Sequence, residues 1–417
     1  MKFGYLEFLQ LPKPWGPDSE HRAWKEGLDR IEFADRAGID HFWEVEHHFL
    51  EEYAGSSASE SFLAAASQRT KRIRLGSGVT LVAPPYNHPA RVAERVAALD
   101  LMSDGRAEFG TGESTAFAEL DAFHISRAEK RAMWREMLPV ITRMMVETPF
   151  RGYQGKYFSM PPRNVVPKPL QKPHPPVWMA VSRQETILLA ATYGLGVLSF
   201  GFLSHQEAGR WTHQYYEALR ECRPLTYRVN PNVAFLSFLM CKRDGAKAVE
   251  RGRANEGLFT FFSKHHYVDG HHQPAATHLT QEYQALSQRH KDIFHSNFTS
   301  CFGTPDDIRK LLLGYEEANV DQIMLILQYG YLHNDEVLES LELFAETVLP
   351  EFKEREEKRA REKANQLEPV IEAAMKRRIE VPAEWYPEDY SYDADGALVS
   401  HYGFGGEAKP RSGGSTN

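Results

Sequence analysis

The chain has few cysteines, no long apolar run and no excess of positive charge. Its three cysteines, Cys222, Cys241 and Cys301, form no CxxC pair among 417 residues, so we expect reduced thiols and not a disulfide framework. No stretch approaches the roughly 18 consecutive apolar residues of a membrane span, and the first residues lack a signal-peptide pattern. The formal net charge of -8 disfavours broad nucleic-acid binding. Together these absences predict a cytoplasmic protein with no membrane or nucleic-acid partner.

Two common catalytic signatures are also missing. The run Gly110-Thr111-Gly112 is too short for a dinucleotide fingerprint and lacks its third glycine, which disfavours a Rossmann-type nicotinamide site. No GxSxG segment occurs, so a hydrolase nucleophile elbow is not predicted.

Strand-like apolar runs alternate with amphipathic, helix-like segments along most of the chain. The expected strands are residues 1–8, 39–45, 73–82, 106–110, 177–181, 196–200, 233–241 and 322–327. The expected helices between and after them are 19–37, 59–68, 89–102, 127–146, 184–192, 205–220, 245–262, 305–318 and 334–349. This alternation predicts an α/β fold with a parallel sheet, and a (β/α)₈ TIM barrel is the preferred architecture. An open doubly wound sheet is the alternative.

Two segments depart from the alternation. Residues 263–297 are polar and show no strand pattern; a long insertion of this kind in a compact domain is typically a lid, a binding loop or a disordered segment, and we expect a mobile insertion. Residues 351–376 read as a highly charged helix, and the segment beyond 381 is irregular and aromatic. We therefore predict one barrel domain over 1–350 and a C-terminal extension over 351–417 that packs on the barrel or on a second subunit.

The insertion contains four histidines. Imidazoles are common metal ligands, but these lack a zinc-type spacing with cysteine or glutamate, so the sequence predicts no metal site. The four are His265, His266, His271 and His272.

Glu46-His47-His48-Phe49 is the most informative segment. It follows the apolar run 39–45, where a buried strand would end. Side chains alternate along a strand, so two adjacent histidines cannot share a face, and one of them can point into a cavity. An imidazole in a cavity can move protons near neutral pH. Glu46 can either orient an imidazole or lie at the surface.

Several segments resemble the luciferase-like, flavin-dependent monooxygenases, particularly the alkanal monooxygenase type. The matching segments are Met1-Lys2-Phe3-Gly4, Glu46-His47-His48-Phe49, His88-Pro89-Ala90-Arg91, 99–106, 109–111 with Phe123, 190–195 and 303–308. They occur in the family's order over about residues 1–350. The resemblance implies a barrel that binds reduced FMN supplied by a separate flavin reductase. It further implies that O₂ forms a C4a-peroxyflavin, which oxygenates a small apolar aldehyde or ketone, in a homodimer or higher homo-oligomer.

The resemblance also implies roles for individual residues. It places His47 as a proton-transfer residue and His48 as a second active-site histidine; the alternative for each is a buried histidine that only packs or hydrogen-bonds a carbonyl. Gly78 and Val79 match a segment beneath the flavin ring, where the family often carries a non-prolyl cis peptide, with a β-bulge as the alternative. Thr111 continues the matched segment at the next strand.

A phosphate needs cations and a helix N-terminus. Arg131 aligns with a phosphate-contacting arginine of the luciferases, although it also fits a solvated helix position. Ser182, Arg183 and Thr186 lie where a predicted strand passes into a predicted helix. Backbone amides and hydroxyls at that point can hold a phosphate or simply cap the helix.

Glu113 departs from the family pattern, because the luciferases place a phosphate-binding arginine there. A carboxylate facing a phosphate would repel it. Three explanations remain open: Glu113 points elsewhere, Arg183 supplies the missing charge, or the cofactor is held differently.

Two other functions compete with the oxygenase. An F420-dependent oxidoreductase would use the same barrel for hydride transfer, but the Glu46–Phe49 segment favours the oxygenase. A non-catalytic flavin-binding protein would account for Glu113, although the intact His47 and His48 count against it.

Overall fold

The computed structural model describes residues 1–269, 271–289 and 298–381. Eight parallel strands form its centre, and each pairs with the next until the last returns to the first. In order around the barrel they are β1 (Lys2–Glu7), β2 (His41–Glu44), β3 (Arg74–Ser77), β5 (Ala107–Gly112), β8 (Val177–Val181), β9 (Gly196–Ser199), β10 (Val233–Cys241) and β12 (Gln322–Ile326). The predicted (β/α)₈ barrel is confirmed, and the open doubly wound sheet is excluded because the sheet closes.

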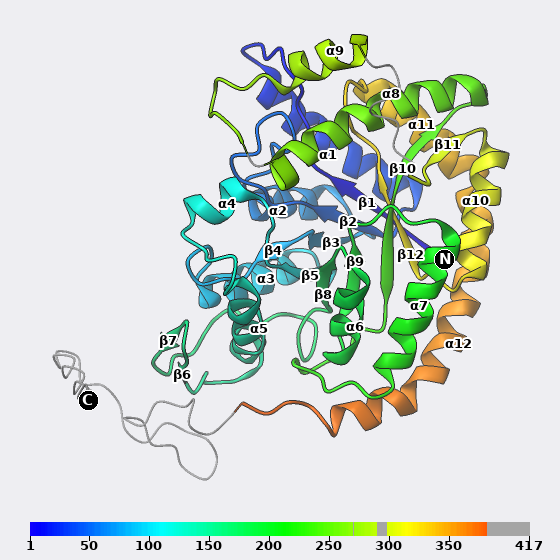
Figure 1. Cartoon of the computed structure of the whole chain (residues 1–417). Helices are drawn as coiled ribbons and strands as arrows, with labels where there is room; N and C mark the ends of the chain where they lie inside the picture. Colours follow the sequence, from blue (N-terminus) through cyan, green and yellow to red (C-terminus); the bar gives the residue numbers. More distant parts are fainter. Residues whose placement is uncertain (270, 290–297, 382–417) are drawn as a thin grey trace.

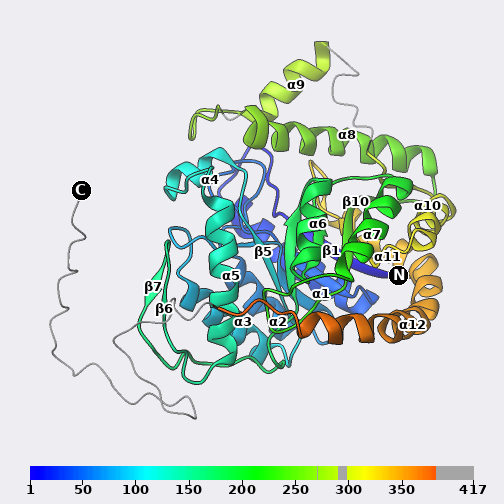
Figure 2. The same cartoon turned by 60° about the horizontal axis from the view of Figure 1, so that its bottom comes forward.

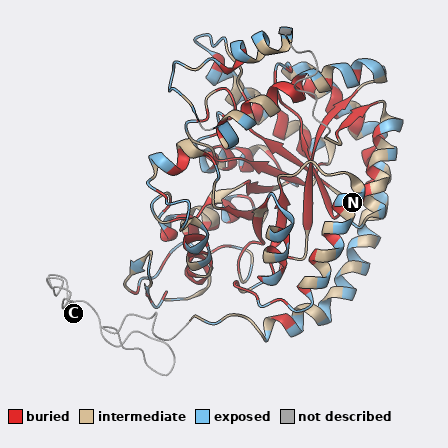
Figure 3. Cartoon of the chain, viewed as in Figure 1, coloured by how far each residue is buried: buried red, intermediate tan, exposed pale blue. Residues whose placement is uncertain are grey.

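The strands form because their apolar runs are buried on both faces. All nine residues of β10 are buried, as expected of a parallel strand covered by helices, and Figure 3 shows the strands red inside helices whose outer faces are exposed. Short strands extend the sheet or lie outside it. They are β4 (Thr80–Leu81), which pairs with β5, β11 (Cys301–Gly303), which pairs with β10, and the hairpin β6 (Tyr153–Gln154) and β7 (Ser159–Met160).

Helices surround the barrel (Figure 1). They are α1 (Ser19–Ala37), α2 (Ser59–Arg69), α3 (Pro89–Met102), α4 (Phe117–Ala122), α5 (Lys130–Val146), α6 (Gln184–Thr192), α7 (His205–Leu219), α8 (Gly245–Lys264), α9 (Leu279–Arg289), α10 (Pro305–Glu317), α11 (Asn334–Thr347) and α12 (Leu349–Met375). Helix α1 ends at Gly38, whose φ of 93° suits glycine. Helix α3 begins at Pro89, whose missing N–H costs nothing at the first position.

The insertion contains more regular structure than its sequence suggests. Helix α8 continues into a π-helical turn, η1 (His265–Asp269), and α9 follows. Figures 1 and 2 both show α8 and α9 together at one end of the molecule. Contacts of Thr277 with Lys13 and of Leu279 with Glu52 place the insertion over the carboxyl ends of β1 and β2. That is the end of a parallel barrel where active-site groups are found.

Helix α12 packs on the barrel that precedes it. Phe352 and Ala374 are buried, and the amino group of Met1 lies 2.7 Å from Glu356 Oε2. The described part of the predicted C-terminal extension is thus a helix on its own barrel, whereas the aromatic tail lies outside the described residues. The three cysteines are buried, unpaired thiols, as predicted. Among the described helices, none combines the length and apolar character needed to cross a membrane.

Candidate active site

His47 lies in the loop after β2 and is hydrogen-bonded at both ring nitrogens. Its Nδ1 is 2.9 Å from Glu119 Oε1 on α4, and its Nε2 is 3.0 Å from the Tyr267 hydroxyl on η1. The ring also lies parallel to Phe8, at the end of β1, at a centroid distance of 6.4 Å. Three other segments of the chain therefore contact this imidazole and hold it in one position.

Glu119 determines which tautomer of His47 forms. The carboxylate is 1% exposed and accepts hydrogen bonds from the Ser114 hydroxyl at 2.5 Å and the His48 amide at 3.0 Å. Burial opposes ionisation, but the charge of His47 and these hydrogen bonds outweigh it and lower the pKa of Glu119. An ionised carboxylate only accepts, so it holds a proton on His47 Nδ1, and in the neutral form of the ring Nε2 is then the acceptor.

Tyr267 completes the chain of hydrogen bonds from the opposite side. Burial, with the nearby Tyr53 and Glu119, raises the pKa of its hydroxyl, so the hydroxyl stays protonated and can donate to His47 Nε2 when that nitrogen is unprotonated. Glu119, His47 and Tyr267 thus form a continuous relay, which we call the proton relay. The sequence did not indicate Glu119 or Tyr267, because they lie 72 and 220 residues from His47. The only sign of Glu119 in the sequence was its place in a segment with apolar residues, Ala116 and Leu120 among them.

His48 points into an aromatic environment instead. Its ring contacts those of Tyr86 and Phe123 at centroid distances of 5.2 and 5.3 Å. Its Nε2 lies 3.5 Å from Glu46 Oε1. Glu46 is 7% exposed, so it is a buried partner of His48 and not a surface carboxylate. The adjacent histidines point to different surroundings, but they lie in the loop after β2 and not on a strand, so the alternation expected along a strand is not the cause.

The cations expected for a phosphate gather at the ends of β5 and β8. Glu113 forms an ion pair with Arg131, so its side chain points toward that guanidinium. Burial lowers the pKa of Lys130; Glu113 opposes that shift, and the positive charges of Arg131, Arg127 and Arg183 add to it. Lys130 and Arg131 act on Glu113, and Arg127 and Arg183 lie near Lys130. Four cations therefore gather here beside two carboxylates, Glu113 and Glu185, the second of which lies 3.9 Å from Arg183. Lys130 was missed by the sequence reasoning, although it is adjacent to Arg131.

The N-terminus of α6 lies beside these cations. Ser182 and Arg183 are exposed, Thr186 is partly exposed, and no side chain caps the helix. Its first amides are therefore able to bind an anion. Arg131 is half-exposed and Arg183 is 74% exposed, so both can reorient toward a ligand.

The remaining predicted cofactor residues lie deeper in the barrel. Thr111 is fully buried, and its hydroxyl donates to the Trp178 carbonyl at 2.8 Å and accepts from Trp134 Nε1 at 3.2 Å. The peptide bond between Gly78 and Val79 is cis, as the resemblance implied. The Gly78 amide donates to the Glu44 carbonyl at 2.7 Å. Thr111 thus serves packing in this structure, and its contact with a cofactor stays a prediction.

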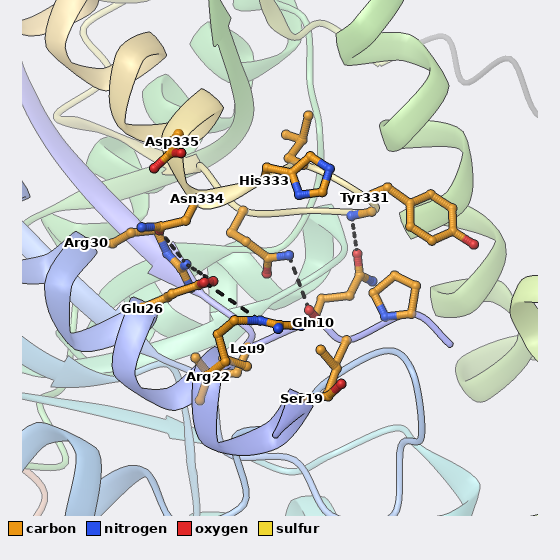
Figure 4. A pocket seen from close by; sticks show the side chains of 16 residues that line it. Leu9, Gln10, Ser19, Arg22, Glu26, Arg30, Tyr331, His333, Asn334 and Asp335 are labelled. Carbon is orange, nitrogen blue, oxygen red and sulfur yellow. Dashed lines mark hydrogen bonds and ion pairs between the residues drawn. The ribbon is translucent and has the colours of Figure 1, made fainter. Parts of the chain in front are cut away.

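A separate cavity of about 570 Å³, lined by polar and apolar side chains, lies at the carboxyl ends of β1 and β12 (Figure 4). Its wall includes Gln10, Arg22, Arg30 and Asn334. Arg30 is engaged by Glu7 at 2.7 Å and by Asn334 at 3.0 Å. None of the proton-relay residues lines it, so it is distinct from the candidate active site.

The chain matches known proteins along most of its length. The model of the luciferase-like monooxygenases matches residues 1–322. An uncharacterised protein of Sinorhizobium fredii is 32% identical over 222 residues, which are 52% of this chain and 61% of that protein. The chain thus spans about three fifths of that relative. 4-Hydroxyprotoasukamycin monooxygenase of Streptomyces nodosus subsp. asukaensis is 26% identical over 84% of this chain and 92% of that enzyme.

The names of three further similar proteins include a cofactor. The oxygenase component of flavin-dependent trigonelline monooxygenase from Acinetobacter baylyi is 28% identical over 46% of this chain and 52% of that protein. Two structures at 20% identity share the fold and show no more than that. The first is the FMN complex of the oxygenating constituent of 3,6-diketocamphane monooxygenase from Pseudomonas putida, with a TM-score of 0.66 over 84% of this chain and 98% of that one. The second is an F420-dependent secondary alcohol dehydrogenase, with a TM-score of 0.63 over 83% of this chain and 98% of that one.

A solved structure at more than 20% identity is also a monooxygenase, in agreement with the family model. Monooxygenase RslO1 from Streptomyces bottropensis is 26% identical, with a TM-score of 0.67 over 84% of this chain and 100% of that one. Because the family model covers residues 1–322 of 417, this chain belongs to the luciferase-like monooxygenase family.

Proposed function

We propose that the chain is the oxygenase of a two-component system that uses reduced FMN and O₂ to oxygenate a small apolar compound, such as an aldehyde or ketone. The observation that carries the proposal is the proton relay of Glu119, His47 and Tyr267 at the carboxyl end of the barrel. Family membership and the names of the flavin-dependent relatives support the choice of reaction and cofactor.

The cation cluster and the α6 N-terminus fit the FMN phosphate. Arg131 and Arg183 would supply charge, and Ser182, Thr186 and the first amides of α6 would supply hydrogen bonds. Arg131 would exchange its partner Glu113 for the phosphate. When bound, reduced FMN supplies the electrons that activate O₂, whereas the protein supplies position, protons and exclusion of water.

The proton relay would hold and move one proton at His47 Nε2. Glu119 stabilises the imidazolium that forms when Nε2 takes a proton, and the Tyr267 hydroxyl reorients as Nε2 changes from acceptor to donor. Proton transfer of this kind typically contributes about 10²–10⁴-fold to a rate. The aromatic rings of Tyr86 and Phe123 beside His48 would favour an apolar substrate.

Anaerobic titration followed by rapid mixing with O₂ tests the proposal. We expect reduced FMN to bind the wild-type chain and the oxidised flavin spectrum to return more slowly than for free reduced FMN. His47→Ala should change that rate constant about tenfold or more, whereas His21→Ala, at an exposed position on α1, should not. Failure of reduced FMN to bind would contradict the cofactor assignment.

The same assay separates the two alternatives. Reduction of oxidised F420 by an alcohol, without oxygen consumption, would favour the F420-dependent hydride transfer that a structure with this fold performs. Equal rates of flavin reoxidation with and without the chain, and no product from an aldehyde and ketone panel, would favour a non-catalytic flavin-binding protein.

We further propose that a separate flavin reductase supplies reduced FMN, since the trigonelline relative is named as an oxygenase component. The chain would act in the cytoplasm as a homodimer or higher homo-oligomer, as the resemblance to luciferases implies. Free diffusion of reduced FMN from an unrelated reductase should support turnover. A monomer in gel filtration at micromolar concentration would contradict the homodimer.

A further inference from the structure

Three of the four insertion histidines converge on one point. His265 and His266 begin the π-helical turn η1, and His272 follows in the next loop. Their ring centroids form a nearly equilateral triangle, with sides of 5.1 Å, 5.1 Å and 5.4 Å. One nitrogen from each ring lies within 4.8 Å of the others. We call these residues the histidine triangle.

The dimensions match those of a tetrahedral zinc site. Nitrogens about 2.0–2.1 Å from a tetrahedral Zn²⁺ lie about 3.3 Å apart, and the centroids of their rings lie about 5.2 Å apart. In the triangle, His265 Nε2 is 3.2 Å from His272 Nδ1. A hydrogen bond between these two rings would account for that distance, but not for a third imidazole at the same spacing from both.

Glu51 holds two of the rings by their outer nitrogens. The backbone carbonyl of Glu51 is 3.1 Å from His266 Nε2, and its carboxylate is 3.6 Å from His272 Nε2. The carboxylate is itself fixed by the Ala275 amide at 2.8 Å. Metal-binding histidines usually donate their second N–H to a carbonyl or carboxylate in this way. The arrangement leaves Nδ1 of both rings as the ligand atom.

A metal ion needs neutral imidazoles as ligands. The three rings are enclosed, since His266 is buried and His265 and His272 are partly buried. The His272 side chain is 10% exposed, and its Nε2 has no hydrogen-bond partner within the usual distance. This nitrogen faces the Glu51 carboxylate, so Nδ1 is the His272 atom that faces His265.

We propose that His265, His266 and His272 bind one Zn²⁺ or a similar divalent transition-metal ion, with a water molecule in the fourth position. Imidazole nitrogen suits these metals, and three protein ligands leave one position open. The sequence argument against a metal relied on the absence of a zinc-type spacing. That argument does not take into account the π-helical turn, which brings His265 and His266 close to His272.

The metal would also fix the insertion over the proton relay. Tyr267 is the next residue after His266, and its hydroxyl contacts His47. A metal that joins η1 to the loop at His272 would hold this tyrosine in place. This consequence rests on the proposed function, whereas the metal site itself does not.

Metal analysis of the untagged, full-length chain tests the site without flavin. After the bound metal is removed with a chelator, Zn²⁺ is added and the excess is dialysed away, we expect one Zn²⁺ to be retained per chain. Co²⁺ added in the same way should give the visible absorption of a four-coordinate ion. His272→Ala and His265→Ala should each weaken Zn²⁺ binding about 100-fold or more. His271→Ala is the matched control, because this exposed neighbour lies outside the triangle, and it should bind as the wild type does.

Several results would overturn the site. They are retention of less than about 0.2 Zn²⁺ per wild-type chain, an equal loss in His271→Ala, or full binding by the His265→Ala, His272→Ala double variant. Circular dichroism and flavin titration of each variant report folding separately. A chain that binds Zn²⁺ but not reduced FMN would keep the metal site and reject the proposed function, and the reverse result would do the opposite.

Discussion

The two ends of the candidate site are built differently. At one end, Glu119, His47 and Tyr267 form a partly buried hydrogen-bonded relay contributed by α4, a strand-end loop and η1. At the other end, Arg131 and Arg183 are half or more exposed, and Arg131 already has a carboxylate partner. Buried networks hold one geometry, whereas exposed ion pairs exchange partners at little cost. We infer that the reacting end is preorganised and that the phosphate end adjusts to its ligand.

Removing the charge of Glu119 should produce the largest change, a fall in turnover at the reacting end. Glu119→Gln loses the anion that selects the His47 tautomer, and we expect turnover to fall about 10- to 100-fold with little change in reduced FMN affinity. Glu119 is a positioning residue, so the pH profile of turnover should also shift. Glu119→Asp should recover part of the rate. Equal losses in rate and in flavin affinity would contradict a separate reacting end.

Tyr267→Phe should also lower turnover, but by less than Glu119→Gln does. It removes one hydrogen bond to His47 Nε2 and leaves the ring in place. A neutral hydrogen bond contributes about 1 kcal/mol, so we expect turnover to fall about fivefold. The matched control is Tyr157→Phe, whose hydroxyl contacts Glu129 and Lys156 away from the relay. An unchanged rate in Tyr267→Phe would remove η1 from the relay.

At the phosphate end, a substitution should change the affinity for reduced FMN and not the rate at saturation. Arg131→Ala should weaken reduced FMN binding about fivefold and leave the rate at saturating flavin unchanged, because the guanidinium would contact only the phosphate. The weakening should shrink at high salt, since exposed charges are screened. A fall in the saturated rate without a change in affinity would contradict this assignment.

Glu113→Gln should act in the opposite direction. The substitution releases Arg131 from its ion pair and removes a negative charge beside the proposed phosphate site. We expect reduced FMN to bind about two- to threefold more tightly, which is a small effect because the pair is partly exposed. Weaker binding would show that Glu113 helps to hold the cofactor.

Acid stability gives the smallest and most independent test of the buried end. Because the pKa of Glu119 is lower in the folded chain than its usual value of about 4.3, its ionised form stabilises the fold above that pH. The stabilisation is lost as the pH falls through the lowered folded pKa. Urea unfolding from pH 5.5 to 3.5 should show the difference between wild type and Glu119→Gln shrinking on acidification. A difference that grows would contradict the lowered pKa.

The barrel could be predicted from the sequence because buried parallel strands are read directly as apolar runs. Residues 177–181 and 233–241 were expected as strands and are β8 and β10 with the same bounds. Helices α1 and α3 were equally recognisable from their Gly38 and Pro89 boundaries. Helix α9 was missed because the segment is polar, with few apolar positions to mark a buried face.

The proton relay could be predicted only in part. His47 carried a local signal, but its partners depend on how the insertion packs over β1 and β2, and no pattern within 263–297 encodes that position. The same applies to the histidine triangle, whose spacing resembles no zinc motif until η1 has formed. Glu113 was recognised as unusual from the sequence, yet its pairing with Arg131 required the structure.

The most direct test compares His47→Ala and Arg131→Ala in one experiment. Each variant is loaded with reduced FMN across a concentration series without oxygen and is then mixed with oxygenated buffer. We expect His47→Ala to bind flavin as the wild type does and to change the reoxidation rate at saturation, and Arg131→Ala to show the reverse. If both variants change affinity and saturated rate together, the separation between a preorganised reacting end and an adjustable phosphate end is wrong.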